Sequence, residues 1–114
     1  MLVTPMQLSA HQHRVLLEYA ATAPNEEVCG LIVGTEVVVL ENVAADKATT
    51  FAMTVKDVIS ATDIFGSVNA VWHSHPSGNT LPSDEDMEAH PGNLPLIIVT
   101  TGEVTVHDTY KKAA

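Results

Sequence analysis

Two histidines separated by one residue are the feature of this sequence that most clearly predicts chemistry. His73 and His75 lie at the end of an apolar run that is typical of a β-strand. Side chains two positions apart on a strand point to the same face, so both imidazoles can approach one metal ion. Asp86, in the first turn of a predicted helix, can bring a carboxylate oxygen to the same ion. Imidazole nitrogen suits Zn²⁺, Cu²⁺, Ni²⁺ and Fe²⁺. Two imidazoles and one carboxylate leave a fourth position for water, which is the composition of a catalytic zinc site.

Two further residue types would complete a hydrolytic site. Ser83 stands three residues before Asp86, so its hydroxyl can cap the helix, or it can lie near the water and the developing oxyanion. A base must also take the proton of the water. Glu27, directly before an apolar run, is the best candidate for this base, and Glu26 is the alternative because the doubled glutamate leaves the register ambiguous.

Three motifs together resemble the signature of the JAMM (MPN-plus) zinc metallopeptidases. They are E-V-C-G-L-I-V-G from Glu27 to Gly34, H-S-H-P from His73 to Pro76, and S-x-x-D from Ser83 to Asp86. The resemblance implies a cytidine-deaminase-like α/β fold, with a mixed sheet, two main helices and a short helix after the metal loop. It also implies that His73, His75 and Asp86 bind one zinc ion, that Glu27 is the general base, and that Ser83 orients the tetrahedral intermediate.

The resemblance further implies a class of substrate. Members of this family cleave isopeptide bonds to ubiquitin-like proteins, or peptide bonds in bacterial settings. The compact layout, Asn42-Val43-Ala44 after a predicted hairpin and Phe51 before the second helix are similar to the bacterial and phage branch, including domains of phage tail assembly proteins. The implied partners are a peptide or ubiquitin-like substrate and an NlpC-type peptidase or tail component. One alternative is a metal-stabilised binding module with little or no turnover. Another is a RadC-like role near DNA.

The remaining histidines and the single cysteine carry weaker predictions. His11 and His13 fall on different sides of a predicted helix and are expected on the surface. His90 is expected in a loop, and His107 is expected to face solvent from a terminal strand. Cys29 is expected to be a small buried hydrophobe. Its position two residues after Glu27 leaves open that it reaches the metal.

The elements that must position these residues are helices and strands without a strict alternation. Ser9 predicts the cap of a first helix, and Thr54 with Asp57 predicts the cap of a second. Strands are expected at 28–33, 37–43, 68–74, 96–101 and 104–108, with a short one at 51–53; helices are expected at 10–22, from 55 to Gly66 and from Asp84, and a loop at 76–82. The predicted apolar positions of the second helix are Val55, Val58, Ile59, Ile64 and Phe65.

Length and composition limit the classes of protein. The 114 residues fit one domain, and the formal charge of −9 with a pI near 4.8 disfavours nucleic-acid binding. One cysteine excludes an intramolecular disulfide, and no apolar stretch or leader pattern predicts a membrane span or signal peptide, so a cytoplasmic protein is expected. The sequence also lacks H-E-x-x-H and P-C-x-x-C, which excludes a thermolysin-type site and a base deaminase.

Overall fold

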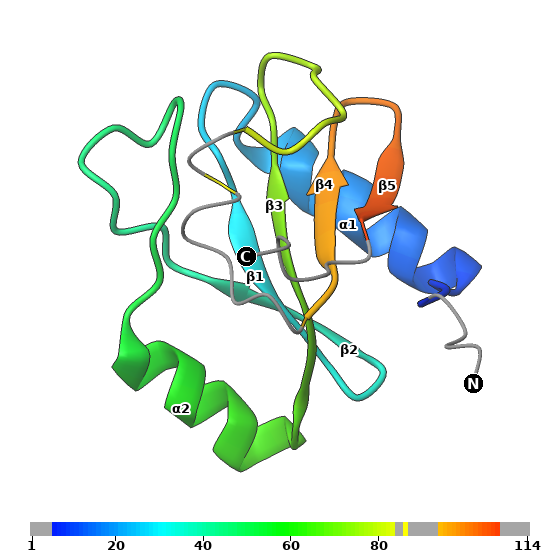
Figure 1. The fold of residues 1–114 in the computed structure, drawn as a ribbon, viewed down its shortest axis with the longest axis vertical. Coiled ribbons are helices and arrows are strands. Elements are labelled where there is room, and N and C mark those ends of the chain that lie inside the picture. Colours follow the sequence, from blue (N-terminus) through cyan, green and yellow to red (C-terminus); the bar gives the residue numbers. More distant parts are fainter. Residues whose placement is uncertain (1–5, 84–85, 87–93, 108–114) are drawn as a thin grey trace, which may run out of the picture.

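A computed structural model describes residues 6–83, 86 and 94–107 (Figure 1). Its elements are α1 (Ala10–Thr22), β1 (Cys29–Val33), β2 (Glu36–Leu40), α2 (Val55–Phe65), β3 (Val68–Ser74), β4 (Leu96–Val99) and β5 (Val104–His107). The expected α+β fold with a mixed sheet and two main helices is confirmed. Among the described residues, no helix is long and apolar enough to cross a membrane.

The sheet topology determines which strand ends meet at the candidate site. The strand order is β2-β1-β3-β4-β5, with β3 and β4 parallel and the other neighbours antiparallel. Because β1 and β3 run in opposite directions, the start of β1 lies beside the end of β3, and Cys29 pairs with His73. The backbone N–H of Ser74 donates to the carbonyl of Val28 at 2.8 Å, which continues this pairing towards Glu27.

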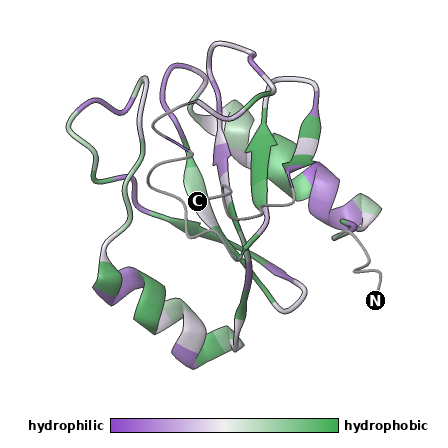
Figure 2. Cartoon of the chain, in the orientation of Figure 1, coloured by the Kyte–Doolittle hydropathy of each residue, from purple (hydrophilic) through white to green (hydrophobic). Residues whose placement is uncertain are grey.

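Helices α1 and α2 lie on opposite faces of the sheet (Figure 1). Alternate residues of β3 therefore enter different cores. Ala70 and Trp72 pack with Leu16 of α1, whereas Val71 packs with Ala61 of α2. His73 follows the alternation of Val71 and belongs to the α2 face. Hydrophobic residues run along β4, which is buried throughout (Figure 2).

Both helices begin where their caps predict. The Ser9 hydroxyl accepts from the backbone N–H of Gln12 at 3.1 Å, and the Gln12 side chain accepts from the Ser9 N–H at 2.9 Å, which forms a capping box. At the start of α2 the Thr54 hydroxyl accepts from the Asp57 N–H at 3.1 Å, which is a simple N-cap. The helix ends before Gly66, whose φ of 110° favours glycine.

The predicted apolar face of α2 is only partly correct. Val55 and Ile64 are 74% and 73% exposed, and Ile59 and Phe65 are also exposed. Hydrophobic and hydrophilic residues alternate along this helix (Figure 2). Its contact with the sheet depends on Ala61, together with the partly buried Val58. The reason is that α2 covers the sheet from one side only, so apolar residues placed around its circumference cannot all face the core.

Several predicted strand boundaries were wrong. Residues 51–53 form no strand, because the Ala52 N–H donates to the Asn42 side chain at 3.1 Å rather than to a strand. The second strand ends at Leu40 rather than at residue 43, and β4 ends at Val99. The predicted helix from Asp84, apart from Asp86, and the tail after His107 lie outside the described residues.

Candidate metal centre

Three side-chain atoms converge beyond the end of β3. The Nε2 atoms of His73 and His75 are 2.9 Å apart, and Asp86 Oδ2 lies 3.2 Å and 3.1 Å from them. We call these atoms the ligand triangle. Ligands about 2.0–2.1 Å from a tetrahedral zinc ion are about 3.3 Å from one another, so the triangle is close to the required size. All three residues are buried. The donor set and its spacing therefore fit a metal ion of the zinc class.

The local sequence explains how the triangle forms. His73 is in β3, and His75 continues the strand direction because its N–H donates to the Val99 carbonyl at 2.8 Å. Asp86 is held by Ser83: the Ser83 N–H donates to Asp86 Oδ2 at 2.8 Å, and the Asp86 N–H donates to Ser83 Oγ at 3.0 Å. This reciprocal pair of bonds has the pattern of a capping box with an aspartate as the second residue. The same carboxylate oxygen thus belongs to the cap and to the triangle.

The ring of His75 is oriented by a backbone carbonyl. Its Nδ1 lies 2.7 Å from the carbonyl oxygen of Asn79, which can only accept, so Nδ1 carries the hydrogen. In the neutral ring the lone pair is then on Nε2, which faces the triangle. Histidine ligands of metal ions commonly donate their second N–H in this way. Asn79 is a site residue that the sequence analysis missed, since its only signal was a polar position in a loop.

Charge in the triangle is concentrated on Asp86. Burial opposes ionisation of this carboxyl group, but hydrogen bonds with His73 and His75 lower its pKa below the usual range. The hydrogen bond to Asp86 raises the pKa of His75, and burial acts against that rise. The site therefore keeps an anionic oxygen beside the imidazoles, which is the charge that a cation needs.

Glu27 lies next to the triangle, but its carboxylate is farther from His73 than the carboxylate of Asp86 is. Its Oε1 is 3.9 Å from His73 Nε2, and candidate ligand atoms of Glu27, His73, His75 and Asp86 all lie within 4.8 Å of one another. Glu27 is 5% exposed, whereas Glu26 is exposed. Of the two candidate bases, the structure brings Glu27 to the cluster. The antiparallel register of β1 and β3 produces this placement.

Ser83 and Cys29 occupy different positions relative to the cluster. The Ser83 hydroxyl accepts from Asp86, as the helix-cap interpretation predicts, and its own hydrogen can still be donated. Cys29 is fully buried, with Sγ 3.7 Å from the Leu40 carbonyl. Burial, followed by the charge of Glu27, raises the pKa of this thiol to about 12. Among the described residues, Cys29 is not in the group that could hold a metal.

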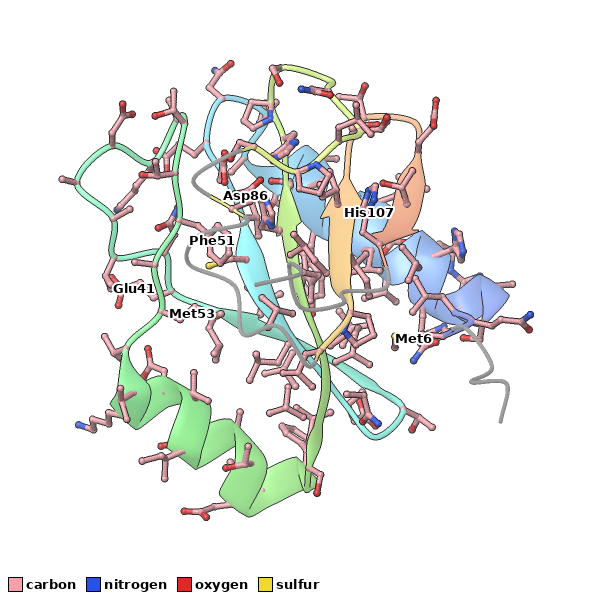
Figure 3. The ribbon with its side chains drawn as sticks, in the orientation of Figure 1. Met6, Glu41, Phe51, Met53, Asp86 and His107 are labelled. Atoms are coloured by element: carbon pink, nitrogen blue, oxygen red, sulfur yellow. The ribbon has the colours of Figure 1, made fainter. Side chains whose placement is uncertain are left out.

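Among the described residues, the other histidines are not in the group that could hold a metal. His11 and His13 are exposed on α1, and His11 Nδ1 lies 3.0 Å from the Arg14 guanidinium. The prediction that His107 faces solvent was wrong. This residue is partly buried, and its Nε2 donates to the Thr80 carbonyl at 2.8 Å (Figure 3). The edge strand β5 therefore supports the loop that leads to Ser83. His90 is outside the described residues.

A family model described as prokaryotic homologs of the JAB domain matches residues 9–111. A structural-genomics protein of Desulfitobacterium hafniense, known from its solution structure, is similar in fold, with a TM-score of 0.72 and 24% sequence identity over 87% of this chain and 79% of that chain. A search of curated proteins found no significant match.

Proposed function

This chain belongs to the family of prokaryotic JAB-domain homologs, and on that premise we propose that it is a zinc-dependent hydrolase of peptide or isopeptide bonds. The observation that carries the proposal is the buried cluster of Glu27, His73, His75 and Asp86. A buried group of two imidazoles and two carboxylates is costly to maintain without a compensating role. The cluster combines the donor set of a catalytic metal site with a separate carboxylate beside it.

His73, His75 and Asp86 would hold the ion. When bound, a zinc ion supplies a Lewis acid that lowers the pKa of water and polarises a carbonyl group. The Nδ1–H of His75, held by the Asn79 carbonyl, keeps the Nε2 lone pair directed at the site. The Ser83 N–H holds Asp86 Oδ2 in place. These second contacts keep the ligands in position before substrate arrives.

Glu27 is proposed as the general base. Its carboxylate takes a proton from the attacking water as the oxygen–carbon bond forms, and it gives that proton to the nitrogen as the carbon–nitrogen bond breaks. The separation of 3.9 Å between Glu27 Oε1 and His73 Nε2 supports this role, because a water bound beside the triangle would lie close to the carboxylate. Ser83 can donate its hydroxyl hydrogen to the carbonyl oxygen as negative charge develops there.

The substrate is proposed to be a peptide or a ubiquitin-like protein, and an NlpC-type peptidase or a phage tail component is proposed as a partner. Support for these comes from the motif resemblance alone. A panel of linear peptides, ubiquitin-like fusions and cell-wall peptides tests the activity. Turnover that a zinc chelator abolishes and added zinc restores is expected. Tight zinc binding without turnover of any substrate, together with a stable protein partner, would replace the enzyme by a metal-stabilised binding module.

A further inference from the structure

The side chain of Asn42 makes four hydrogen bonds, three within residues 42–52 and one to Glu27. Its Nδ2 donates to the carbonyls of Glu27 at 2.9 Å and Thr50 at 3.0 Å. Its Oδ1 accepts from the N–H groups of Ala44 at 3.0 Å and Ala52 at 3.1 Å. We call these bonds the Asn42 network. The network joins the two ends of the loop 42–52, where the Val43 N–H also donates to the Ala52 carbonyl at 2.9 Å, although no regular secondary structure holds these ends.

One end of the Asn42 network determines the position of Phe51. Thr50 and Ala52, the residues on either side of Phe51, both bond to the Asn42 side chain. Phe51 points from this loop towards the sheet (Figure 3), and its ring stacks on His73 with centroids 4.4 Å apart and planes at 22°. An aromatic ring in this position fixes the plane of the imidazole and excludes water from that side.

The other end of the network reaches the backbone of Glu27. The Glu27 carbonyl accepts from Asn42, and the Glu27 N–H donates to the Lys47 carbonyl at 2.6 Å. Both backbone polar groups of Glu27 are thus bonded to the loop 42–52. Glu27 lies two residues before Cys29, where β1 begins. The bonds to the loop 42–52 therefore hold the backbone of Glu27 at a position where the hydrogen bonds of the sheet do not.

We infer that Asn42 is a positioning residue of the active site, which holds Glu27 and the His73 ring in a fixed relation through the loop 42–52. This inference rests on the proposed function. Asn42 touches neither the ligand triangle nor a reacting atom, so its effect is geometric. Displacement of a catalytic group by about 1 Å can lower a rate about 100-fold. Metal binding depends on ligands outside this loop and is expected to survive the loss of the network.

The substitution Asn42→Asp tests the inference because a carboxylate keeps both acceptor bonds and loses both donor bonds. Asn69→Asp is the matched control: it makes the same charge change on β3, where the side chain accepts from the Gly34 N–H at 2.7 Å. We expect Asn42→Asp to lower kcat at least about tenfold on the substrate that the wild type cleaves, with one zinc ion per chain retained. In the metal-free protein, the His73 ring-proton resonances are expected to shift as Phe51 moves. The control is expected to change neither.

Unchanged His73 resonances together with kcat within about twofold of wild type would overturn the inference. If the wild type cleaves no substrate, the proposed function fails, and the resonances still decide whether Asn42 positions Phe51. If Asn42→Asp does not fold, two other measurements replace it. These are amide hydrogen exchange in the wild type and the kcat of the variant Phe51→Leu. Protected Ala44 and Ala52 amides with a lowered kcat for Phe51→Leu support the inference, whereas exchange at the rate of open loops or an unaffected kcat contradicts it.

Discussion

Glu26 and Glu27 are adjacent in the chain but have different environments. Glu27 is buried beside His73, and Glu26 is exposed, so the pair offers a matched test of the general base. We expect Glu27→Gln to lower kcat by about 10²–10⁴, because the amide cannot take the proton of water. Glu26→Gln is expected to leave kcat within about twofold of wild type.

Metal analysis of the same two variants separates a base from a ligand. Zinc content is expected to stay at one ion per chain in Glu27→Gln, since its carboxylate lies outside the ligand triangle. Loss of zinc in this variant, measured by mass spectrometry of the purified protein, would show that Glu27 is a ligand. Equal loss of activity in both variants would show that net charge matters, rather than the position of Glu27.

The buried thiol of Cys29 gives a prediction about reactivity and pH. Burial, followed by the charge of Glu27, raises its pKa to about 12 from 9.0. At pH 8 the folded protein then holds about one thiolate per ten thousand molecules, against about one in ten when unfolded. Because the thiol is both buried and protonated, alkylation by iodoacetamide is expected to be much slower in the folded protein than in urea. Rapid modification without unfolding would contradict this placement.

The same shift predicts how Cys29 affects stability with pH. Its folded pKa lies above its unfolded value of 9.0, so its contribution is complete below pH 9.0 and is lost as pH rises above it. Urea unfolding at pH 8 and pH 10 measures this change. Cys29→Ala provides the control, because without the thiol the part of the pH dependence that Cys29 causes is expected to disappear.

At the scale of elements, Gly30 determines how closely β1 approaches its neighbours. A Cβ atom at this position would lie 1.8 Å from the Val38 carbonyl oxygen and 2.8 Å from Trp72 Nε1. The Trp72 N–H donates to that carbonyl at 3.2 Å, so the indole lies directly against the Gly30 backbone. Gly30→Ala is expected to destabilise the fold by about 1–3 kcal/mol or more, through overpacking and the loss of this bond.

The control for this prediction is Gly102→Ala. An added Cβ at Gly102 meets no atom within 4 Å, so stability is expected to change by less than about 0.5 kcal/mol. Urea midpoints of the two variants measure the difference. A Gly30→Ala protein as stable as Gly102→Ala would show that β1 and Trp72 are not packed together in this way.

Local signals predicted most elements and the two hairpins β1–β2 and β4–β5, but they could not predict which strands distant in the sequence become neighbours. The caps at Ser9 and Thr54 gave the starts of both helices, because a cap depends on residues three positions apart. The triangle could be anticipated for a similar reason, since His73 and His75 share one strand. The approach of Glu27 depends on the register between β1 and β3, and the sequence alone does not determine which distant strands become neighbours.

The contribution of Asn42 was equally inaccessible to sequence reasoning. Its four hydrogen bonds reach Glu27, Ala44, Thr50 and Ala52, and nothing in an isolated asparagine indicates such a set. The exposed apolar residues of α2 show a second limit of prediction from the sequence. Helical spacing predicted five apolar positions, but four of them are exposed, because which positions a neighbour covers is a property of the assembled fold.

At the scale of the whole molecule, metal binding is expected to stabilise the fold. The triangle joins β3 to Asp86, so an ion bound there links two parts of the chain. At a free zinc concentration about 100 times its Kd, the free energy of unfolding rises by about 2.7 kcal/mol, which corresponds to a Tm increase of about 10 °C. Thermal unfolding with zinc and with chelator measures this shift.

The variant Asp86→Ala supplies the control for zinc stabilisation. It removes one corner of the triangle, so added zinc is expected to leave its Tm nearly unchanged. A Tm increase as large as that of the wild type would mean that zinc stabilises the protein at another site. With the formal charge of −9, weak binding of cations elsewhere on the surface is the effect that this comparison removes.

The donor types of the ligand triangle also determine which ions the protein can discriminate. Two of its three corners are imidazole nitrogens, which suit borderline ions such as zinc. Calcium takes about six to eight oxygen ligands at about 2.3–2.6 Å, and magnesium prefers about six in an octahedron. Two imidazoles and one carboxylate oxygen satisfy neither requirement. The abundant hard cations of a cell would therefore compete poorly for this position, even at concentrations far above that of zinc.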